Sequence, residues 1–258
     1  MKIKNLLTVF IIFLVALSAN AQYRTIDAYS FFSGYSFFKT DFGARNDWNT
    51  NINNTGVELG GKIFVNLFPY HWQWRGMYHI KTNFILTYAH GRVEHIGRWT
   101  DNKYSPTAVK LKNMFATPTV IGGGMGFEYS LQDLTFFNFT RLYGIYRFNV
   151  TTGVDLMAFY YMPNIKSNLG DITDVNVQPN ILHSRFVGKV YPKSGITFGA
   201  TFKVTFYYQL TESYHIYLEN RTTWFLSDKV DGLDVNDAPD KFTDWLYTPA
   251  IGITYIVW

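Results

Sequence analysis

The sequence predicts an all-β protein, a transmembrane antiparallel up-and-down β-barrel that follows a cleaved signal peptide. Three observations lead to this class: an apolar N-terminal segment with a small-residue ending, a high aromatic content, and stretches in which apolar and polar residues alternate. Aromatic residues make up 19% of the 258 residues, and charged residues only 16%. A barrel with lipid outside and polar side chains inside is expected to have this composition and this alternation.

Residues 1–21 have the features of a secretory signal peptide. Two lysines precede an apolar run from Leu6 to Leu17, and Ala19-Asn20-Ala21 forms a small-x-small cleavage site. A membrane anchor needs about 20 apolar residues, and this run is shorter. The chain has no cysteine, which excludes disulfides and a lipid-modified N-terminus. We therefore expect residues 22–258 to form the mature barrel.

The clearest strand runs from Gly195 to Leu210. Every even position from Ile196 onward is apolar or aromatic, and the odd positions are polar or glycine except for Tyr207. A period of two indicates an extended strand with one apolar and one polar face. The run is longer than the average soluble strand of about five or six residues. It suits a tilted membrane-crossing strand of roughly nine to eleven.

The first three strands are expected before residue 90. Residues 25–38 are aromatic and strand-like, although they alternate imperfectly. Residues 57–67 and 78–88 alternate cleanly. Pro69 ends the former, because proline cannot donate a hydrogen bond to a ladder.

Four more strands complete the set of eight. Residues 117–129 alternate apolar side chains with glycines from Gly122 to Gly126, and such glycines relieve crowding inside a barrel or let the strand bend. Alternation then returns in residues 144–158, 214–224 and 246–258.

The connections alternate between long and short. Bacterial outer-membrane barrels combine short periplasmic turns with long outer loops and an even number of strands. Eight strands with both termini in the periplasm satisfy this pattern. Ten strands are the alternative, if residues 130–143 or the loop after Pro163 contain another hairpin. The expected outer loops are residues 39–55, 91–116, 163–194 and 227–245.

One face of every strand turns toward the barrel interior, which in an eight-stranded barrel is only wide enough to be filled by side chains. The inward set contains both signs of charge, and an unpaired charge in a confined space is costly. We therefore expect a network of ion pairs and hydrogen bonds that plugs the lumen, with a narrow polar conduit as the alternative. The expected network is Glu58, Lys62, His79, Lys81, Glu128, Arg147, Asp155, Lys203, His215, Glu219 and Arg221.

The last long loop is dense in carboxylates, which are ligands that calcium prefers. Its spacing does not match an EF-hand, so a solvated acidic loop is the competing interpretation. The candidate calcium contacts are Asp228, Asp231, Asp234 and Asp237. We predict no other metal site and no cofactor.

Basic residues in the other loops are candidates for contact with lipopolysaccharide phosphates. Arg92, Arg98 and Arg185 can each form charge-assisted hydrogen bonds to phosphate oxygens.

The loops also contain residue types that a catalytic site would need. His183-Ser184, with His90 and His95, supplies the residue types of a lipid hydrolase. Nothing in their spacing fixes a geometry, so we predict no enzymatic activity.

The end of the chain resembles a known assembly signal, and several other segments resemble those of a protein family. Gly252, Tyr255, Val257 and Trp258 resemble the C-terminal signal by which the barrel-assembly machinery recognises outer-membrane barrels. Four further stretches resemble a family of small, functionally uncharacterised outer-membrane β-barrel proteins of Bacteroidota, chiefly flavobacteria. They are residues 19–22, 47–56, 227–234 and 244–246. The resemblance implies an outer-membrane location in a Gram-negative bacterium and transfers no active site.

The sequence therefore predicts a structural or interaction protein of the envelope that acts through its outer loops. A small porin or uptake channel is the first alternative, and a lipid-modifying enzyme the second. The expected partners are outer-membrane lipid, lipopolysaccharide, the assembly machinery and an envelope protein. The net charge of +4, of which two lysines belong to the signal peptide, is too small to imply nucleic acid.

Overall fold

A computed structural model describes residues 26–42, 52–65, 79–97, 100–102, 104–131, 147–234 and 244–257. Several expectations lie outside these residues: the signal peptide, most of residues 130–143, and the site residues Arg98, Asp237 and Trp258.

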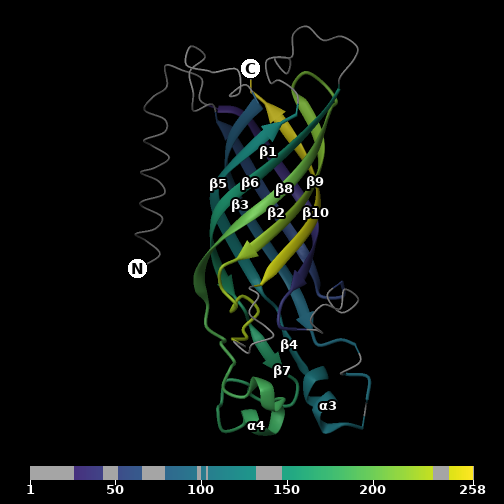
Figure 1. Cartoon of the computed structure of the whole chain (residues 1–258), viewed down its shortest axis with the longest axis vertical. Coiled ribbons are helices and arrows are strands. Elements are labelled where there is room, and N and C mark those ends of the chain that lie inside the picture. Colours follow the sequence, from purple (N-terminus) through teal and green to yellow (C-terminus); the bar gives the residue numbers. More distant parts are fainter. Residues whose placement is uncertain are drawn as a thin grey trace.

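Eight long strands form a closed barrel (Figure 1). Each strand pairs antiparallel with its neighbours along the chain, and the ring closes where the first strand pairs with the last, for example Tyr29 with Tyr255. This confirms the predicted fold class. The wall consists of β1 (Ile26–Lys39), β2 (Thr55–Val65), β3 (Ile80–Glu94), β5 (Thr119–Ser130), β6 (Phe148–Met162), β8 (Gly195–Gln209), β9 (Tyr214–Phe225) and β10 (Trp245–Ile256).

The two ends of the barrel differ. At the terminal end, β1 begins and β10 ends, since Ala28 pairs with Ile256. At the loop end, Lys39 pairs with Trp245, and the longer described connections emerge there. The turn between β8 and β9 lies at the terminal end and is short, with Leu210 N and Thr211 N both donating to Tyr214 O.

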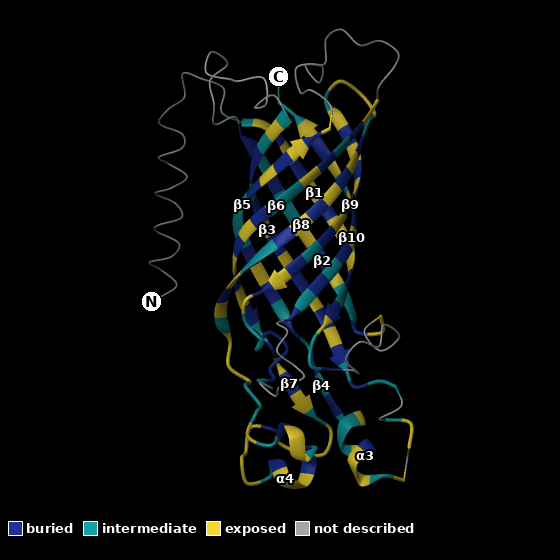
Figure 2. Ribbon diagram, viewed as in Figure 1, coloured by how far each residue is buried: buried dark blue, intermediate teal, exposed yellow. Residues whose placement is uncertain are grey.

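Exposed and buried residues alternate along the strands of the barrel wall (Figure 2), and many of the exposed residues are large and apolar. Outward side chains include Phe31, Phe198 and Leu218, which are 65%, 64% and 60% exposed. The imperfect alternation of the first strand has a simple cause, because β1 carries aromatic rings on both faces. Phe32 and Phe38 point into the barrel and are buried.

The long connections at the loop end form a folded head. Its elements are α3 (Pro106–Lys112), β4 (Met114–Ala116), β7 (Ile165–Ser167), α4 (Gln178–Ile181) and η4 (Ser184–Phe186). β4 continues the pairing of β3 and also pairs with β7, so these two short strands lie beyond the barrel wall. No helix in the described part of the chain is long and apolar enough to cross a membrane.

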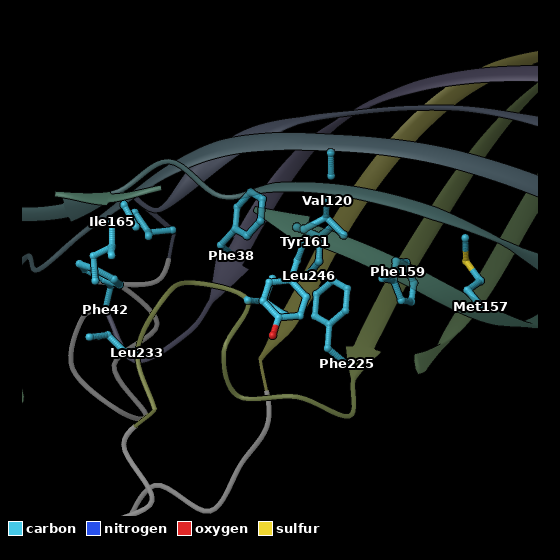
Figure 3. Close-up of a cluster of buried hydrophobic side chains, with 14 of the residues drawn as sticks. Phe38, Phe42, Val120, Met157, Phe159, Tyr161, Ile165, Phe225, Leu233 and Leu246 are labelled. Carbon is cyan, nitrogen blue, oxygen red and sulfur yellow. The ribbon is translucent and has the colours of Figure 1, made fainter. Parts of the chain in front are cut away.

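One apolar core joins the barrel to the head (Figure 3). It includes Met157 and Phe159 inside the barrel and continues to Phe42, Ile165 and Leu233 in the connections. The sequence predicts a polar loop after Pro163. The connection instead contributes isolated apolar side chains to this core, namely Ile165, Ile172, Ile181, Leu182 and Phe186.

Candidate functional site

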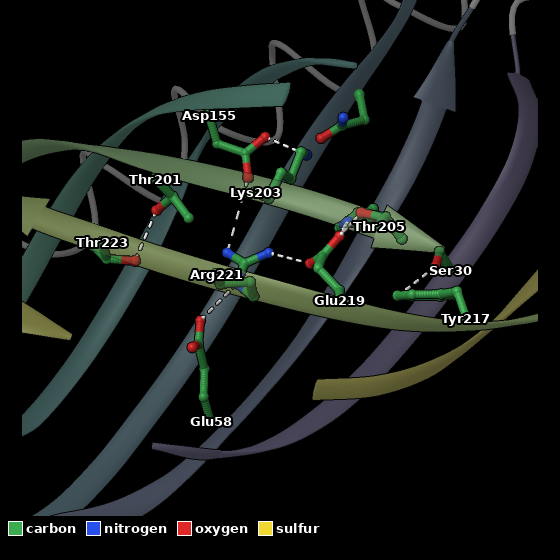
Figure 4. A network of polar contacts seen from close by, with 12 residues as sticks. Ser30, Glu58, Asp155, Thr201, Lys203, Thr205, Tyr217, Glu219, Arg221 and Thr223 are labelled. Carbon is green, nitrogen blue, oxygen red and sulfur yellow. Dashed lines mark hydrogen bonds and ion pairs between the residues drawn. The ribbon is translucent and has the colours of Figure 1, made fainter. Parts of the chain in front are cut away.

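Charged side chains of β2, β5, β6, β8 and β9 occupy the centre of the lumen, and Figure 4 shows several of them. Arg221 on β9 is fully buried, and its guanidinium lies within ion-pairing distance of three carboxylates. The distances are 2.8 Å to Glu219 Oε1, 3.4 Å to Glu58 Oε1 and 3.8 Å to Asp155 Oδ2. The Arg221 guanidinium also lies 4.5 Å from the centroid of the Phe32 ring, so a cation–π contact adds to its ion pairs.

Two lysines connect the remaining carboxylates of the network. Lys62 Nζ lies 2.5 Å from Glu219 Oε2 and 3.3 Å from Glu128 Oε1. Lys203 Nζ lies 2.8 Å from Glu128 Oε1 and 2.5 Å from Asp155 Oδ1. Because each carboxylate of this set contacts at least one cation, the two signs alternate through the lumen.

Hydroxyl groups bind carboxylate oxygens of the same network. Tyr207 Oη donates to Glu128 Oε2 at 3.0 Å, and Thr205 Oγ1 donates to Glu219 Oε2 at 2.7 Å. Buried charges are tolerated when they are paired and hydrogen-bonded in this way.

Glycine on β5 makes room for the network. A Cβ added at Gly126 would overlap Asp155 Oδ1 and approach the Asn83 amide. By contrast, a Cβ at Gly123 on the outer face would meet Leu86 at an ordinary 3.8 Å.

Between the charged layer and the loop end, the lumen is filled by apolar side chains. This differs from the polar filling that the sequence predicts. Toward the loop end, the inward side chains of the strands include Phe38, Val120, Tyr161, Phe225 and Leu246, all buried. Charged side chains, with aromatic rings packed among them, therefore fill the middle of the barrel, and apolar side chains fill its loop end.

The structure brings together most of the predicted lumen residues but not all of them. Lys81 Nζ lies over the rings of Phe64 and Tyr207, and His215 is buried on the inner face of β9.

Two predicted lumen residues lie elsewhere, at the terminal end. Arg147 is exposed just before β6 begins, because the strand has not yet entered the wall. The His79 ring stacks on the outward Tyr129 ring, and its Nδ1 contacts Ser130 O at 2.9 Å.

A second group of carboxylates lies at the loop end. We call Asp41, Asp228, Asp231 and Asp244 the mouth cluster. Asp231 accepts hydrogen bonds from Leu233 N at 2.8 Å and Asp41 N at 3.0 Å. Asp244 Oδ2 accepts from Val230 N at 3.0 Å and Asp231 N at 3.3 Å. These bonds tie the β9–β10 connection to the segment that follows β1.

The mouth cluster is not a solvated acidic loop, because Asp231 and Asp244 are buried. Burial and the nearby Asp228 raise the pKa of Asp231 to about 7. Burial and Asp234 likewise raise the pKa of Asp228 to about 7. Burial and neighbouring carboxylates hold the pKa of Asp244 well above its usual range.

The mouth cluster offers no metal site in the described residues, where no three His, Asp or Glu side chains are placed to hold an ion. Asp234, one of the predicted calcium contacts, pairs instead with Lys229 at 2.9 Å. Sequence reasoning misses Asp41 as a member of this cluster, since it lies 190 residues from Asp231 and only folding brings the two together.

The candidate catalytic histidines are separated. His90 faces outward from β3, where its Nδ1 contacts Thr119 Oγ1 at 2.8 Å. His95 is buried between the rings of Phe42 and Phe186, and burial lowers its pKa to about 3. His183 Nδ1 accepts from Arg185 N, as a cap of η4. These contacts are structural and assemble no nucleophile–base pair.

The predicted phosphate contacts lie on the surface. Arg92 points outward at the end of β3, pairs with Glu94, and places its guanidinium 4.6 Å from the centroid of the Phe115 ring. Arg185 is exposed on η4 in the head.

No protein-family model and no curated protein sequence matches this chain. Among solved structures, a major outer-membrane protein of Thermus thermophilus is similar at a TM-score of 0.48 and 10% identity, over 89% of this chain and 98% of that one. The neisserial surface protein A has a TM-score of 0.43 and 6% identity, over 89% and 96%. Ail, the attachment invasion locus protein of Yersinia pestis, has a TM-score of 0.40 and 9% identity, over 91% and 100%.

Proposed function

We propose that this chain is an outer-membrane β-barrel with a closed lumen, which acts at the bacterial surface through its head as a structural or interaction protein of the envelope. The observation that carries the proposal is the contrast between the outer wall and the interior. Large apolar side chains cover the outside, whereas paired charges and an aromatic layer fill the inside.

Membrane insertion accounts for the outer wall. A closed barrel satisfies its backbone hydrogen bonds within the wall and leaves no strand edge, as a hydrocarbon environment requires. Aromatic residues lie at both ends of the wall, including Tyr255 and Tyr214 at the terminal end and Trp224 and Trp245 at the loop end. Such girdles are typical of membrane interfaces.

The difference between the two ends of the barrel supports a proposed orientation. Short turns and both termini are expected in the periplasm, and the head outside the cell. The C-terminal residues Gly252, Tyr255, Val257 and Trp258 would serve as the assembly signal, and residues 1–21 as the signal peptide. We also propose that the chain belongs to the Bacteroidota family of small outer-membrane barrels that its loop segments resemble.

The packed lumen favours a closed barrel over a channel. Arg221, Lys62 and Glu128 are almost completely buried, so ions would have to displace fixed pairs to pass. We expect no conductance steps from the purified protein in planar bilayers at up to moderate voltage. Steady single-channel steps would contradict the closed lumen and favour the small-channel alternative.

The head is the expected partner surface, with lipopolysaccharide phosphates as one target through Arg92 and Arg185. We expect the double variant Arg92→Ala, Arg185→Ala to bind purified lipopolysaccharide more weakly, because charge-assisted hydrogen bonds to phosphate are lost. Lys112→Ala, which removes an exposed cation from α3, is the matched control. Equal binding by all three proteins would count against this target.

A further inference from the structure

A groove opens on the outside of the barrel wall at the loop end. It has a volume of about 210 Å³ and lies among β1, β9, β10 and the connection after β1. Its lining residues include Phe37, Lys39, Ile52, Thr222, Trp245 and Tyr247.

The groove is apolar along its length. Phe37 and Tyr247 stack with ring centroids 6.1 Å apart, and Trp224 lies beside Trp245 with centroids 6.0 Å apart. Tyr247 Oη donates to Asn220 Oδ1 at 3.2 Å, which holds its ring against the wall. Because these side chains lie on the outward face, the groove is continuous with the exposed apolar band of the barrel.

One cation lies at the edge of the groove. Lys39 Nζ is 5.3 Å from the centroid of the Trp245 ring. Lys39 is exposed, and no carboxylate of the described residues forms an ion pair with it. Arg92, also outward at the loop end, lies over the Phe115 ring but is paired with Glu94. Lys39 is therefore the cation that places positive charge where the apolar band ends.

We propose that this groove holds one acyl chain of a phosphorylated glycolipid of the outer leaflet, the lipid A part of lipopolysaccharide, with its phosphate on Lys39. The inference rests on the membrane placement proposed above. An acyl chain suits the groove because it is apolar and open to the hydrocarbon. A phosphate suits Lys39 because the ammonium group can form charge-assisted hydrogen bonds with phosphate oxygens at the membrane interface.

Native mass spectrometry of the purified full chain, titrated with lipopolysaccharide, tests this site. We expect Lys39→Ala to weaken binding about tenfold, since a hydrogen bond to a charged group is lost. Lys39→Arg should restore binding, because arginine keeps the charge and the donors. Thr222→Trp should weaken binding at least as much as Lys39→Ala, because it fills the groove, and Lys112→Ala should leave binding unchanged.

The ligand forms separate the contributions of phosphate and chain. Dephosphorylated lipopolysaccharide should bind the unchanged protein as weakly as the intact form binds the Lys39→Ala variant. Phosphatidylglycerol bound as tightly as lipopolysaccharide would overturn the glycolipid assignment. Unchanged binding in both Lys39→Ala and Thr222→Trp, or no binding by the unchanged protein, would overturn the groove itself.

Two further measurements on the same proteins, outer-membrane fractionation and conductance in bilayers, test the proposed function independently of the groove. A barrel that fractionates with the outer membrane and does not conduct, yet binds without regard to Lys39 and Thr222, would refute only the groove. A protein absent from the outer membrane would refute both.

Discussion

The lumen network and the mouth cluster both bury carboxylates, but the two sites stabilise them by different means. In the lumen, Glu128 lies between Lys62 and Lys203, and every neighbouring acid also meets a cation. In the mouth cluster, the nearest charges that act on Asp244 are those of Asp231, Asp41 and Asp228, all of the same sign. Backbone N–H groups supply the hydrogen bonds there.

Because of this difference, the two regions respond differently to substitution and to pH. Paired opposite charges in a closed space hold one another in position, and breaking a pair is strongly unfavourable. A cluster of like charges can lower its energy by taking up protons, because burial disfavours the ionised carboxylates. The lumen therefore acts as a rigid plug, and the mouth as a contact whose strength depends on pH.

The largest effect is expected from removing the central cation of the lumen. Arg221→Met leaves Glu58, Asp155 and Glu219 without the guanidinium, and breaking such a buried pair typically costs about 3–5 kcal/mol. Urea unfolding of the barrel in detergent, followed by tryptophan fluorescence, measures this change.

A second substitution checks that charge is the cause. Glu58→Gln in the Arg221→Met background should recover part of the loss, because it removes one unpaired carboxylate. Lys112→Met, at the exposed end of α3, is the control and should leave the unfolding midpoint unchanged. A lumen that tolerates Arg221→Met as well as this control would contradict the rigid plug.

A smaller effect is expected from crowding the same lumen without changing its charge. Gly126→Ala pushes a methyl group into Asp155 and Asn83, and overpacking of this kind typically costs about 1–3 kcal/mol. Gly123→Ala adds the same methyl group to the outer face, where space is available, and should be close to neutral. Equal unfolding midpoints for the two variants would show that the inner face is not close-packed at β5.

The mouth cluster should respond to pH in the opposite sense to an ordinary paired carboxylate. The folded-state pKa values of Asp228 and Asp231 are raised to about 7, so these two carboxyl groups bind more protons in the folded protein than in the unfolded chain between about pH 4 and 7. Their contribution to stability is fully present below that window and is lost as pH rises through about 7. Amide exchange at Val230 and Leu233, corrected for its intrinsic pH dependence, should be slower at pH 5 than at pH 8.

Asp244→Asn isolates the charge in this cluster. The amide oxygen can still accept from Val230 N, but one carboxylate is gone. We therefore expect amide exchange at pH 8 to be slower than in the unchanged protein, and the dependence of exchange on pH to be flatter. Protection that is the same at both pH values in the unchanged protein would remove the contrast between mouth and lumen.

The wall could be predicted from the sequence because its period of two is a local property. This period places Lys62, Glu128 and Lys203 on the inner face, since the position along a strand decides which face a side chain takes. The head and the mouth cluster could not, because their contacts join distant segments. Ile172 and Phe186 stand singly among polar residues, and Asp41 meets Asp231 only through the closed ring. The exact ends of the strands could not be predicted either, since Arg147 and His79 lie at the terminal end and not in the lumen.

The smallest effect on stability is expected from removing an ion pair that lies at the surface instead of in the lumen. The Arg92 side chain is 60% exposed, and its pair with Glu94 lies in solvent, where such pairs typically contribute about 0–1 kcal/mol. Arg92→Ala should therefore leave the urea midpoint almost unchanged, while Arg221→Met lowers it strongly. The same two substitutions should reverse their order in lipopolysaccharide binding once each protein is folded, because only Arg92 can reach a phosphate. A large loss of stability in Arg92→Ala would show that burial is not what separates the two arginines.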